Sequence, residues 1–304
     1  MRNLPSLEQV AAVATSEAPL TLCCVILTMG NRPVELARAI DSVRALDGEP
    51  VDLVVVGNGA DLPALPADAT AIRLPENVGV SEGRNIGVAA CTGDVILFLD
   101  DDAWYHDPAI GEYVASRFAA DPKLAVLAFH IIDPAGGPGA RWHVPRLRAG
   151  DPGRSSPVTT FGGGLCAIRR SAYSEAGGLP NTFFFAHEEI DLSWRLVDRG
   201  YRLGYDAAAE VSHPHVANTR HGTWYRQDGR NRVLLVRRNL PWPLAWAYLF
   251  DWLAITVVRE RSPAAIRKWL SGFAEGWRMD PGPRHPISAR AVWRLTRAGR
   301  PPVI

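Results

Sequence analysis

The stretch GDVILFLDDDAWYHDP, residues 93–108, sets the interpretation of the whole chain. Five apolar residues, Val95 to Leu99, run directly into three carboxylates, Asp100, Asp101 and Asp102. A short apolar run with polar flanks predicts a strand that is buried on both faces of a sheet. In extended chain Asp100 and Asp102 share one side, and Asp101 points to the other. Adjacent carboxylates repel one another unless a cation lies among them, so the triplet indicates either a Mg²⁺ or Mn²⁺ site or an acidic cap of the next helix.

Two earlier apolar runs, Leu20–Thr28 and Val51–Gly59, flank residues 34–46, in which apolar side chains recur at helical spacing. A strand, a helix and a strand in this order predict a right-handed βαβ unit and hence a parallel sheet. Ligands of such sheets bind at the carboxyl ends of the strands. Three polar residues lie there, as ligand contacts or as ordinary turn residues: Thr28, Arg32 and Asn58.

The next segments continue this alternation of strands and helices. Residues 71–74 predict a short strand, and Ser81 is a suitable N-cap for a helix that runs to Cys91. Arg84 lies in the first turns of this helix, whose positive end favours a phosphate or a nucleotide edge. Leu124–Ile132 predicts another strand, and the segment Asp133–Pro157, rich in Gly, Pro and Arg, is either disordered or a working loop over the site.

Charge and cysteine content limit the kinds of partner and the cellular compartment that the sequence indicates. The 304-residue chain has a net charge of +1, which gives no indication of nucleic-acid binding. Residues 220–304 hold 16 Lys and Arg against 5 Asp and Glu, whereas residues 1–219 hold 17 against 27. This basic end indicates an anionic partner such as the inner face of a membrane, or simply an Arg-rich solvated surface. The four cysteines have no CxxC spacing and the first 20 residues lack a signal-peptide pattern, so we expect a cytoplasmic protein.

Seven motifs in this order resemble those of family 2 glycosyltransferases, which have the GT-A fold. They are TMGNRP (28–33), VVVGNG (54–59), NVGVSEGRNIG (77–87), DVILFLDDDA (94–103), GGGLCAIRRSAYSEAGGL (162–179), HEEIDLSWRL (187–196) and SHPH (212–215). The resemblance implies an α/β fold, with a Rossmann-like, mostly parallel sheet flanked by helices. It implies a GT-A domain over residues 1–220, with a nucleotide-sugar half at about 20–133 and an acceptor half at about 158–220. Residues 221–304 would form a helical, basic C-terminal region.

The same resemblance implies an activity and its ligands. The enzyme would move a sugar from a nucleoside-diphosphate sugar to an acceptor hydroxyl, with inversion and with the help of Mn²⁺ or Mg²⁺. Asp100 to Asp102 would be the DXD motif, with Asp102 as metal ligand and His213 as a second one, ahead of His215. The nucleotide would lie on the remaining polar residues at the strand ends: Thr28, Arg32, Asn58, Arg84, Asp100 and Asp101.

One departure from the family pattern concerns the nucleotide. The turn after the second strand usually carries acids, but this chain has Gly57 and Asn58 there. The amide oxygen of Asn58 can still accept from a pyrimidine N–H, so the preference for a base is open while the site remains.

The general base is expected in HEEIDLSWRL, where Glu188, Glu189 and Asp191 cluster at the start of a helical pattern. The resemblance indicates Glu189, where the family more often has Asp, with Asp191 as the reserve. Acids at a helix N-terminus also favour the helix dipole, so the choice among the three stays open.

Residues 241–258 form an apolar segment with three Trp and one charge, Asp251. A spanning helix needs roughly 20 apolar residues, so an interfacial or a packing helix is favoured over a span. Trp also suits a homodimer seam.

The acceptor is open among saccharide, lipid-linked and natural-product hydroxyls. Two alternatives remain for the whole chain, a nucleotidyltransferase on a related fold and a non-catalytic nucleotide-sugar-binding protein.

Overall fold

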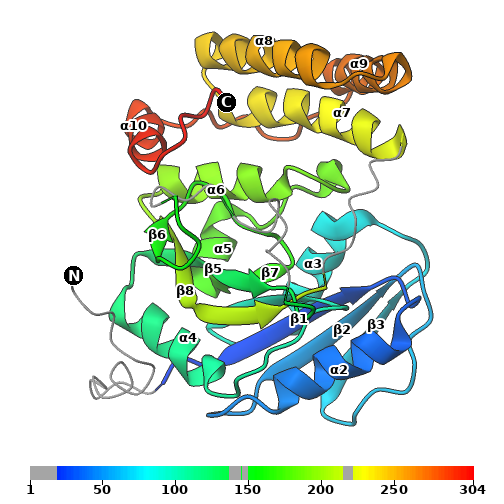
Figure 1. Ribbon diagram of the computed structural model, residues 1–304, viewed down its shortest axis with the longest axis vertical. Coiled ribbons are helices and arrows are strands. Elements are labelled where there is room, and N and C mark those ends of the chain that lie inside the picture. Colours follow the sequence, from blue (N-terminus) through cyan, green and yellow to red (C-terminus); the bar gives the residue numbers. More distant parts are fainter. Residues whose placement is uncertain (1–18, 137–144, 146–149, 215–221) are drawn as a thin grey trace.

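The computed structural model describes residues 19–136, 145, 150–214 and 222–304. Its centre is an eight-stranded sheet in the order β3-β2-β1-β4-β7-β5-β8-β6 (Figure 1). The strands are β1 (Leu22–Thr28), β2 (Asp52–Asn58), β3 (Ala69–Leu74), β4 (Val95–Asp100), β5 (Leu124–Ile132), β6 (Ser156–Pro157), β7 (Leu165–Arg169) and β8 (Arg202–Ser212). The helices are α2 (Pro33–Arg44), α3 (Gly79–Ala90), α4 (Ile110–Ala120), α5 (Arg170–Ala176), α6 (Glu188–Asp198), α7 (Gly222–Asn239), α8 (Trp242–Arg259), α9 (Pro263–Arg278) and α10 (Ala289–Arg297).

The apolar strands are buried on both faces, as their composition predicts. Cys23 and Val25 of β1 face one core, which includes α3, α5 and α6, while Cys24 and Ile26 face a second core with α2 and α4. β1 pairs in parallel with β2 and β4, and β2 pairs in parallel with β3. The mostly parallel α/β sheet flanked by helices is therefore confirmed.

The sequence predicts a strand at Leu165–Ile168, which is β7, but does not indicate its direction. It runs antiparallel between β4 and β5, and Leu99 of β4 pairs with Leu165. The glycines at 162–164 immediately precede β7, so this pairing brings them to the carboxyl end of β4, beside Asp100. The reversed strand thus carries a second segment of chain to the edge where ligands of such sheets bind.

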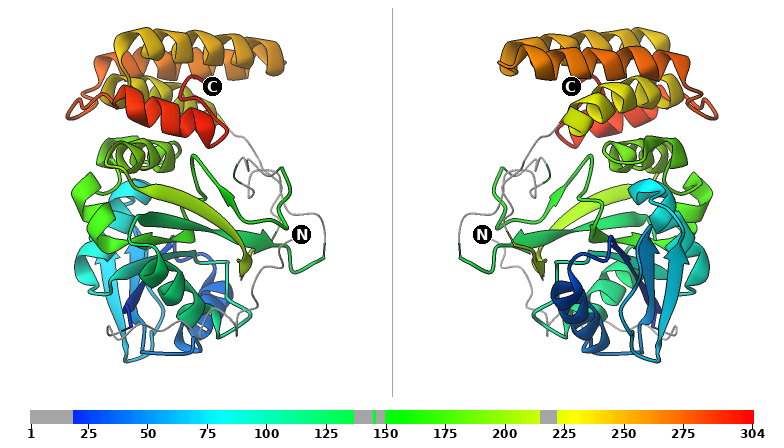
Figure 2. Two further views of the ribbon diagram at one scale, coloured as in Figure 1. Left: turned by 90° about the vertical axis from the view of Figure 1, so that its left-hand side faces the viewer. Right: turned by 90° about the vertical axis from the view of Figure 1, so that its right-hand side faces the viewer.

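The C-terminal helices α7 to α10 form a further layer over α6 (Figures 1 and 2). Trp194 of α6 and Tyr248 of α8 belong to one continuous apolar core and meet edge to face, with ring centroids 6.0 Å apart. The helical C-terminal extension is therefore confirmed, although α9 and α10 were not predicted individually. Among the described residues, no helix is long and apolar enough to span a bilayer.

Candidate active site

Three neighbouring parallel strands carry polar residues to one edge of the sheet. β2, β1 and β4 end at Asn58, Thr28 and Asp100, and Asp101 and Asp102 follow on the turn after β4. The Thr28 hydroxyl donates to Asp101 Oδ2 at 2.6 Å. The structure therefore gathers Thr28 and the acidic triplet at the edge that the sequence predicts.

Arginines lie against each carboxylate of the triplet. Arg32 Nη1 lies 2.5 Å from Asp102 Oδ2 and 3.3 Å from Asp101 Oδ1, and Arg84 Nη2 donates to Asp100 Oδ1 at 3.1 Å. Burial raises the pKa of Asp101, and the hydrogen bond from Thr28 offsets only part of this effect. The positive charges of the two arginines thus offset the repulsion among the three carboxylates.

His213 lies directly after β8 and faces the triplet. Ser212, the last residue of β8, pairs with Trp104, and His213 Nε2 lies 3.2 Å from Asp102 Oδ1. Burial by itself would lower the pKa of His213, but the hydrogen bond and the charge of Asp102 raise it. Burial would raise the pKa of Asp102, but His213 and Arg32 together lower it. The two predicted metal ligands are therefore adjacent, whereas His215 and residues 137–144 and 146–149 of the 133–157 segment lie outside the described residues.

The donor set of Asp102 and His213 fits a divalent metal that is shared with a substrate. Two neighbouring ligands of an octahedral ion, each about 2.1 Å from it, lie about 3 Å apart, close to the 3.2 Å between Asp102 Oδ1 and His213 Nε2. Among the described residues, no group of three or more His, Cys, Asp or Glu could hold a metal. Mg²⁺-type ions commonly bind through one or two protein ligands and complete their shell with water and substrate phosphates.

The glycines before β7 let the backbone approach the carboxylates. A Cβ on Gly163 would lie 2.6 Å from Glu189 Oε1 and 2.7 Å from Arg84 Nη1. A Cβ on Gly164 would overlap the Asp100 carboxylate, whereas one on Gly162 would meet nothing within 4 Å. The backbone at Gly163 and Gly164 thus lies between Asp100 at the end of β4 and Glu189 at the start of α6.

Glu188 and Glu189 begin α6 beside Arg84. Glu188 is 2% exposed, its Oε1 lies 3.9 Å from Arg84 Nη1, and its Oε2 has no hydrogen-bond partner among the described residues. Burial, followed by the charge of Glu189, raises the pKa of Glu188 to about 8. Burial also raises the pKa of Glu189, although its own backbone amide, Arg84 and the Gly163 amide act in the opposite direction. The site therefore contains a carboxylate pair with a raised affinity for a proton.

Asp191 does not join this cluster. It is fully buried, and Oδ1 accepts from Arg195, while Oδ2 accepts from Arg238 Nε at 2.8 Å and from Asn239 Nδ2 at 2.6 Å. Both of its oxygens bind donors within the protein, and these donors connect α6 to the end of α7. The structure thus gives Asp191 a packing position between α6 and α7, and its role as the reserve base stays a prediction.

Asn58 holds the turn that leads into α3. Its Nδ2 donates to Asn77 Oδ1 at 3.0 Å and to the Gly79 carbonyl at 3.2 Å, and its Oδ1 accepts from the Val78 amide at 2.9 Å. The amide oxygen retains a second lone pair. A contact between Asn58 and a nucleobase therefore stays a prediction.

The segment before α6 has an unusual backbone. Phe184, Ala186 and His187 have φ of 60°, 73° and 72°, a region that residues other than glycine seldom adopt. Asn231 Nδ2 of α7 lies within 2.9 Å of the carbonyl oxygens of Phe183, Phe185 and Ala186. Such strain persists only where the surroundings over-determine it, and Asn231 supplies that constraint directly before Glu188 and Glu189.

A second contact from α7 holds His187 itself. His187 Nε2 lies 2.9 Å from Asp228 Oδ1, and Asp228 Oδ2 accepts from Arg232 Nε at 3.0 Å and from Trp269 Nε1 at 2.7 Å. Burial alone would raise the pKa of Asp228, but Arg232 and His187 hold it well below its usual range. Sequence reasoning missed Asp228 and Asn231, because only the α7 helical pattern was visible and nothing in it indicates the segment that α7 meets.

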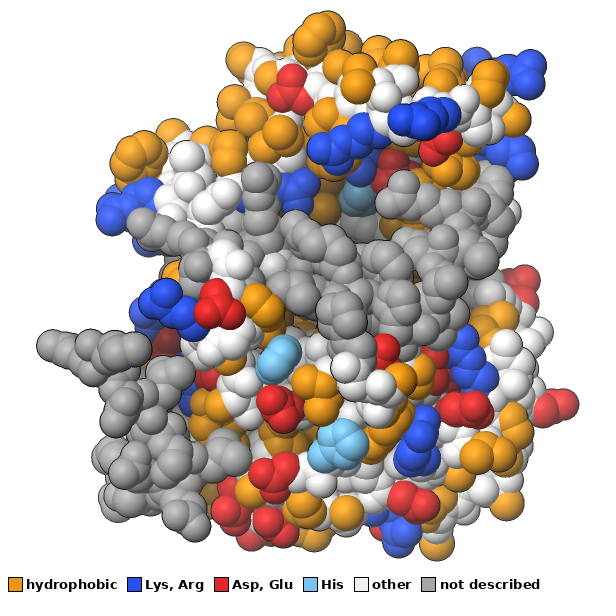
Figure 3. Space-filling view, in the orientation of Figure 1, with side chains coloured by type: hydrophobic (Ala, Val, Ile, Leu, Met, Phe, Trp, Pro, Cys, Tyr) orange, Lys and Arg blue, Asp and Glu red, His pale blue; other side chains and the backbone are white. Residues whose placement is uncertain are grey.

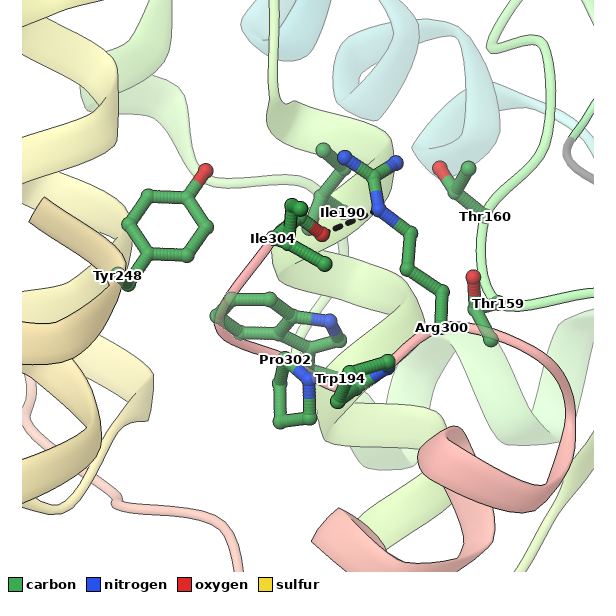
Figure 4. A pocket seen from close by; sticks show the side chains of 9 residues that line it. Thr159, Thr160, Ile190, Trp194, Tyr248, Arg300, Pro302 and Ile304 are labelled. Atoms are coloured by element: carbon green, nitrogen blue, oxygen red, sulfur yellow. Dashed lines mark hydrogen bonds between the residues drawn. The ribbon is translucent and has the colours of Figure 1, made fainter. Parts of the chain in front are cut away.

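The first turns of α6 adjoin residues 300–304. Figure 4 shows a small pocket in which the side chains of Ile190, Trp194, Thr159 and Thr160 meet the C-terminal residues. Ile190 follows Glu189, and Thr160 lies shortly before the glycine loop. The full lining is Thr159, Thr160, Ile190, Trp194, Tyr248, Arg300, Pro301, Pro302 and Ile304.

The fold is that of the GT-A class of glycosyltransferases. Solved structures of that class share the fold. One is GalNAc-T7 with UDP, GalNAc and Mn²⁺, with a TM-score of 0.60 and 18% identity, covering 86% of this chain and 55% of that one. Another is the mannosyltransferase PcManGT from Pyrobaculum calidifontis with GDP-Man and Mn²⁺, with a TM-score of 0.55 and 15% identity, covering 96% of this chain and 84% of that one.

Residues 24–177 match the family described as glycosyl transferase family 2, and the chain belongs to that family. It is 30% identical over 257 residues to the pre-mycofactocin glycosyltransferase of Mycobacterium tuberculosis (strain CDC 1551 / Oshkosh). The match covers 77% of this chain and 52% of that protein, so the chain spans about half the length of this relative.

Proposed function

We propose that the chain transfers a sugar from a nucleoside-diphosphate sugar to an acceptor hydroxyl by a single, inverting displacement. The observation that carries this proposal is the close approach of the Gly163–Gly164 backbone to Asp100 on one side and to Glu189 on the other. It connects the acidic strand end, where a metal ion would bind the donor diphosphate, to a carboxylate that can receive a proton. Both are needed when a hydroxyl displaces a nucleoside diphosphate in one step.

The donor diphosphate would lie at the acidic triplet with a metal ion. Asp102 and His213 would hold Mn²⁺ or Mg²⁺, and the ion, when bound, neutralises the leaving diphosphate. Arg32, with a side chain 42% exposed, is available to move from Asp102 and Asp101 to a phosphate. Thr28, Asn58, Arg84, Asp100 and Asp101 complete the proposed nucleotide site.

Glu189 is the proposed general base. Glu188 is almost fully buried and Asp191 is saturated by donors, whereas Glu189 is half-buried beside the glycine loop. A raised pKa brings a carboxylate closer to the operating pH, where a base accepts a proton most effectively. Glu188 and Arg84 then set the charge around Glu189 without touching the acceptor.

The experiment measures nucleoside diphosphate release from UDP-GalNAc, UDP-GlcNAc and GDP-mannose with Mn²⁺. Pre-mycofactocin, named in the relative's activity, is one acceptor to test beside saccharide and lipid-linked hydroxyls. We expect Glu189→Gln to lower kcat by roughly 10²–10⁴-fold while donor binding persists. Glu49→Gln, an exposed glutamate before β2, is the matched control and should behave as wild type.

Three outcomes would reject the assignment. Full turnover by Glu189→Gln would remove the proposed base, and a product with a retained anomeric configuration by NMR would remove the single displacement. Release of pyrophosphate instead of nucleoside diphosphate would identify a nucleotidyltransferase.

A further inference from the structure

Helix α8 presents an outer face without a charged or polar side chain. The exposed residues along α8, up to its last residue Arg259, are Trp242, Pro243, Trp246, Ala247, Phe250, Ala254, Val257 and Val258. Phe250 is 71% exposed and Val258 is 82% exposed. A helix on the surface of a globular protein normally places charged and polar residues on that side, so this face requires a partner.

The opposite side of α8 is already occupied by the protein. Ala245, Tyr248 and Leu249 are buried in the core that α6 and α7 share, and the Tyr248 hydroxyl accepts from Arg232 at 2.8 Å. The one acid of the helix, Asp251, is half-buried. The outer face is thus additional apolar surface, and packing of α8 within this chain does not account for it.

Indole rings extend the apolar face toward α9. The Trp242 and Trp246 rings stack with centroids 6.3 Å apart, and Trp246 stacks on Trp277 of α9 at 5.5 Å. Trp side chains combine an apolar ring with one N–H donor, a combination that suits the boundary between hydrocarbon and water. The face therefore resembles the apolar side of a helix that lies in an interface.

Cationic residues border this face at the end of α8 and along α9. Five of them are exposed: Arg259, Arg261, Arg267, Lys268 and Arg278. The same stretch holds three acids, Glu260, Glu275 and Asp280, and Glu275 forms an ion pair with Arg226. Figure 3 shows hydrophobic side chains gathered over α8, with Lys and Arg toward α9. The border is therefore net positive.

We propose that α8 and the adjoining surface of α9 bind the surface of an anionic lipid bilayer. The apolar face would enter the boundary between headgroups and acyl chains, and the basic border would contact anionic headgroups. Charge complementarity favours lipid over a second copy of this chain. A symmetric dimer through this face would bring two basic borders together, because the same patch meets itself. The proposal is independent of the chemistry proposed for the active site.

The test measures co-sedimentation of the full chain with vesicles of phosphatidylcholine alone and of phosphatidylcholine mixed with phosphatidylglycerol. We expect binding to the anionic vesicles, weakened by salt, and at least ~10-fold weaker binding for Trp246→Ser/Phe250→Ser. Arg267→Glu/Lys268→Glu should lose the preference for anionic lipid. Trp293→Ser removes a 62% exposed Trp from α10 and is the matched control that should bind as wild type.

Far-UV circular dichroism of each variant separates loss of binding from loss of folding. Absence of binding to anionic vesicles, or equal binding by Trp246→Ser/Phe250→Ser, would overturn the proposal. A dimer in sedimentation velocity that Trp246→Ser dissociates, without vesicle binding, would overturn it in favour of an interface between copies.

Discussion

Replacement of Gly163 by alanine tests whether the glycine loop sets the position of Glu189. The added Cβ would lie 2.6 Å from Glu189 Oε1 and 2.7 Å from Arg84 Nη1, and ordinary contact begins at 3.4 Å. The Glu189 carboxylate must therefore retreat by about 0.8 Å, because 3.4 minus 2.6 leaves that difference. The backbone of Gly163 is not in the left-handed region, so the conformation of the loop itself tolerates alanine.

The expected magnitude follows from this displacement. A misplacement of about 1 Å at a reacting group can lower a rate on the order of 10²-fold. The groups that must move are the ends of two side chains, so the free energy of unfolding should fall by only about 1 kcal/mol. We therefore expect kcat to decrease on the order of 10²-fold.

Gly162, the residue directly before Gly163, provides a control. A Cβ there meets nothing within 4 Å, so Gly162→Ala should retain wild-type kinetics and gain up to about 1 kcal/mol from a less flexible unfolded chain. The assay is nucleoside diphosphate release under saturating donor, together with urea unfolding of both variants. A Gly163→Ala enzyme with kcat within about twofold of Gly162→Ala would refute the argument that this contact positions the base.

Three further predictions concern the surroundings of the base and the metal. Asn231→Ala should lower the free energy of unfolding by about 2 kcal/mol, because it leaves the Phe185 and Ala186 carbonyls without their side-chain donor. Urea unfolding measures this change, and Gln227→Ala on the same helix is the control. The Glu188 pKa rises from 4.5 to about 8 on folding, so the folded state binds the proton more tightly than the unfolded state does. Stability therefore falls as pH increases from 4.5 to about 8. Glu188→Gln should flatten this dependence of Tm on pH, and an unchanged slope would contradict the prediction. His213→Ala should abolish most of the thermal stabilisation that Mn²⁺ and UDP give together, while UDP alone should act equally on both proteins.

The framework of the sheet could be predicted because it depends on local patterns. Continuous apolar runs such as Val51–Gly59 and Leu124–Ile132 indicate doubly buried strands, and the intervening helical spacing fixes a parallel connection. The parallel arrangement also predicts that ligands bind at the carboxyl ends of the strands, where Thr28 and the acidic triplet lie. The antiparallel insertion of β7 could not be predicted, because the Leu165–Arg169 pattern is compatible with either strand direction.

The choice among the three acids of α6 depended on contacts that no local pattern encodes. Glu188, Glu189 and Asp191 are equivalent as sequence, since each is an acid near a helix start. Their environments differ because Arg84, the Gly163 backbone and the Arg238–Asn239 pair come from three distant segments. Only tertiary structure tells the buried partner, the half-buried candidate base and the packing residue apart.

The domain boundary predicted near residue 220 separates α7 from the earlier chain in sequence. It does not separate α7 from the candidate active site. Asn231 and Asp228 lie beyond that boundary, yet they bind the Phe183–His187 backbone that immediately precedes Glu188. Three residues of that segment have positive φ, each of which costs about 1–3 kcal/mol, so the segment would relax without these contacts. Relaxation would alter the direction in which α6 begins and, with it, the position of Glu189 against the glycine loop. The residues after 220 therefore help to position Glu189, the proposed base, in addition to carrying the apolar face of α8.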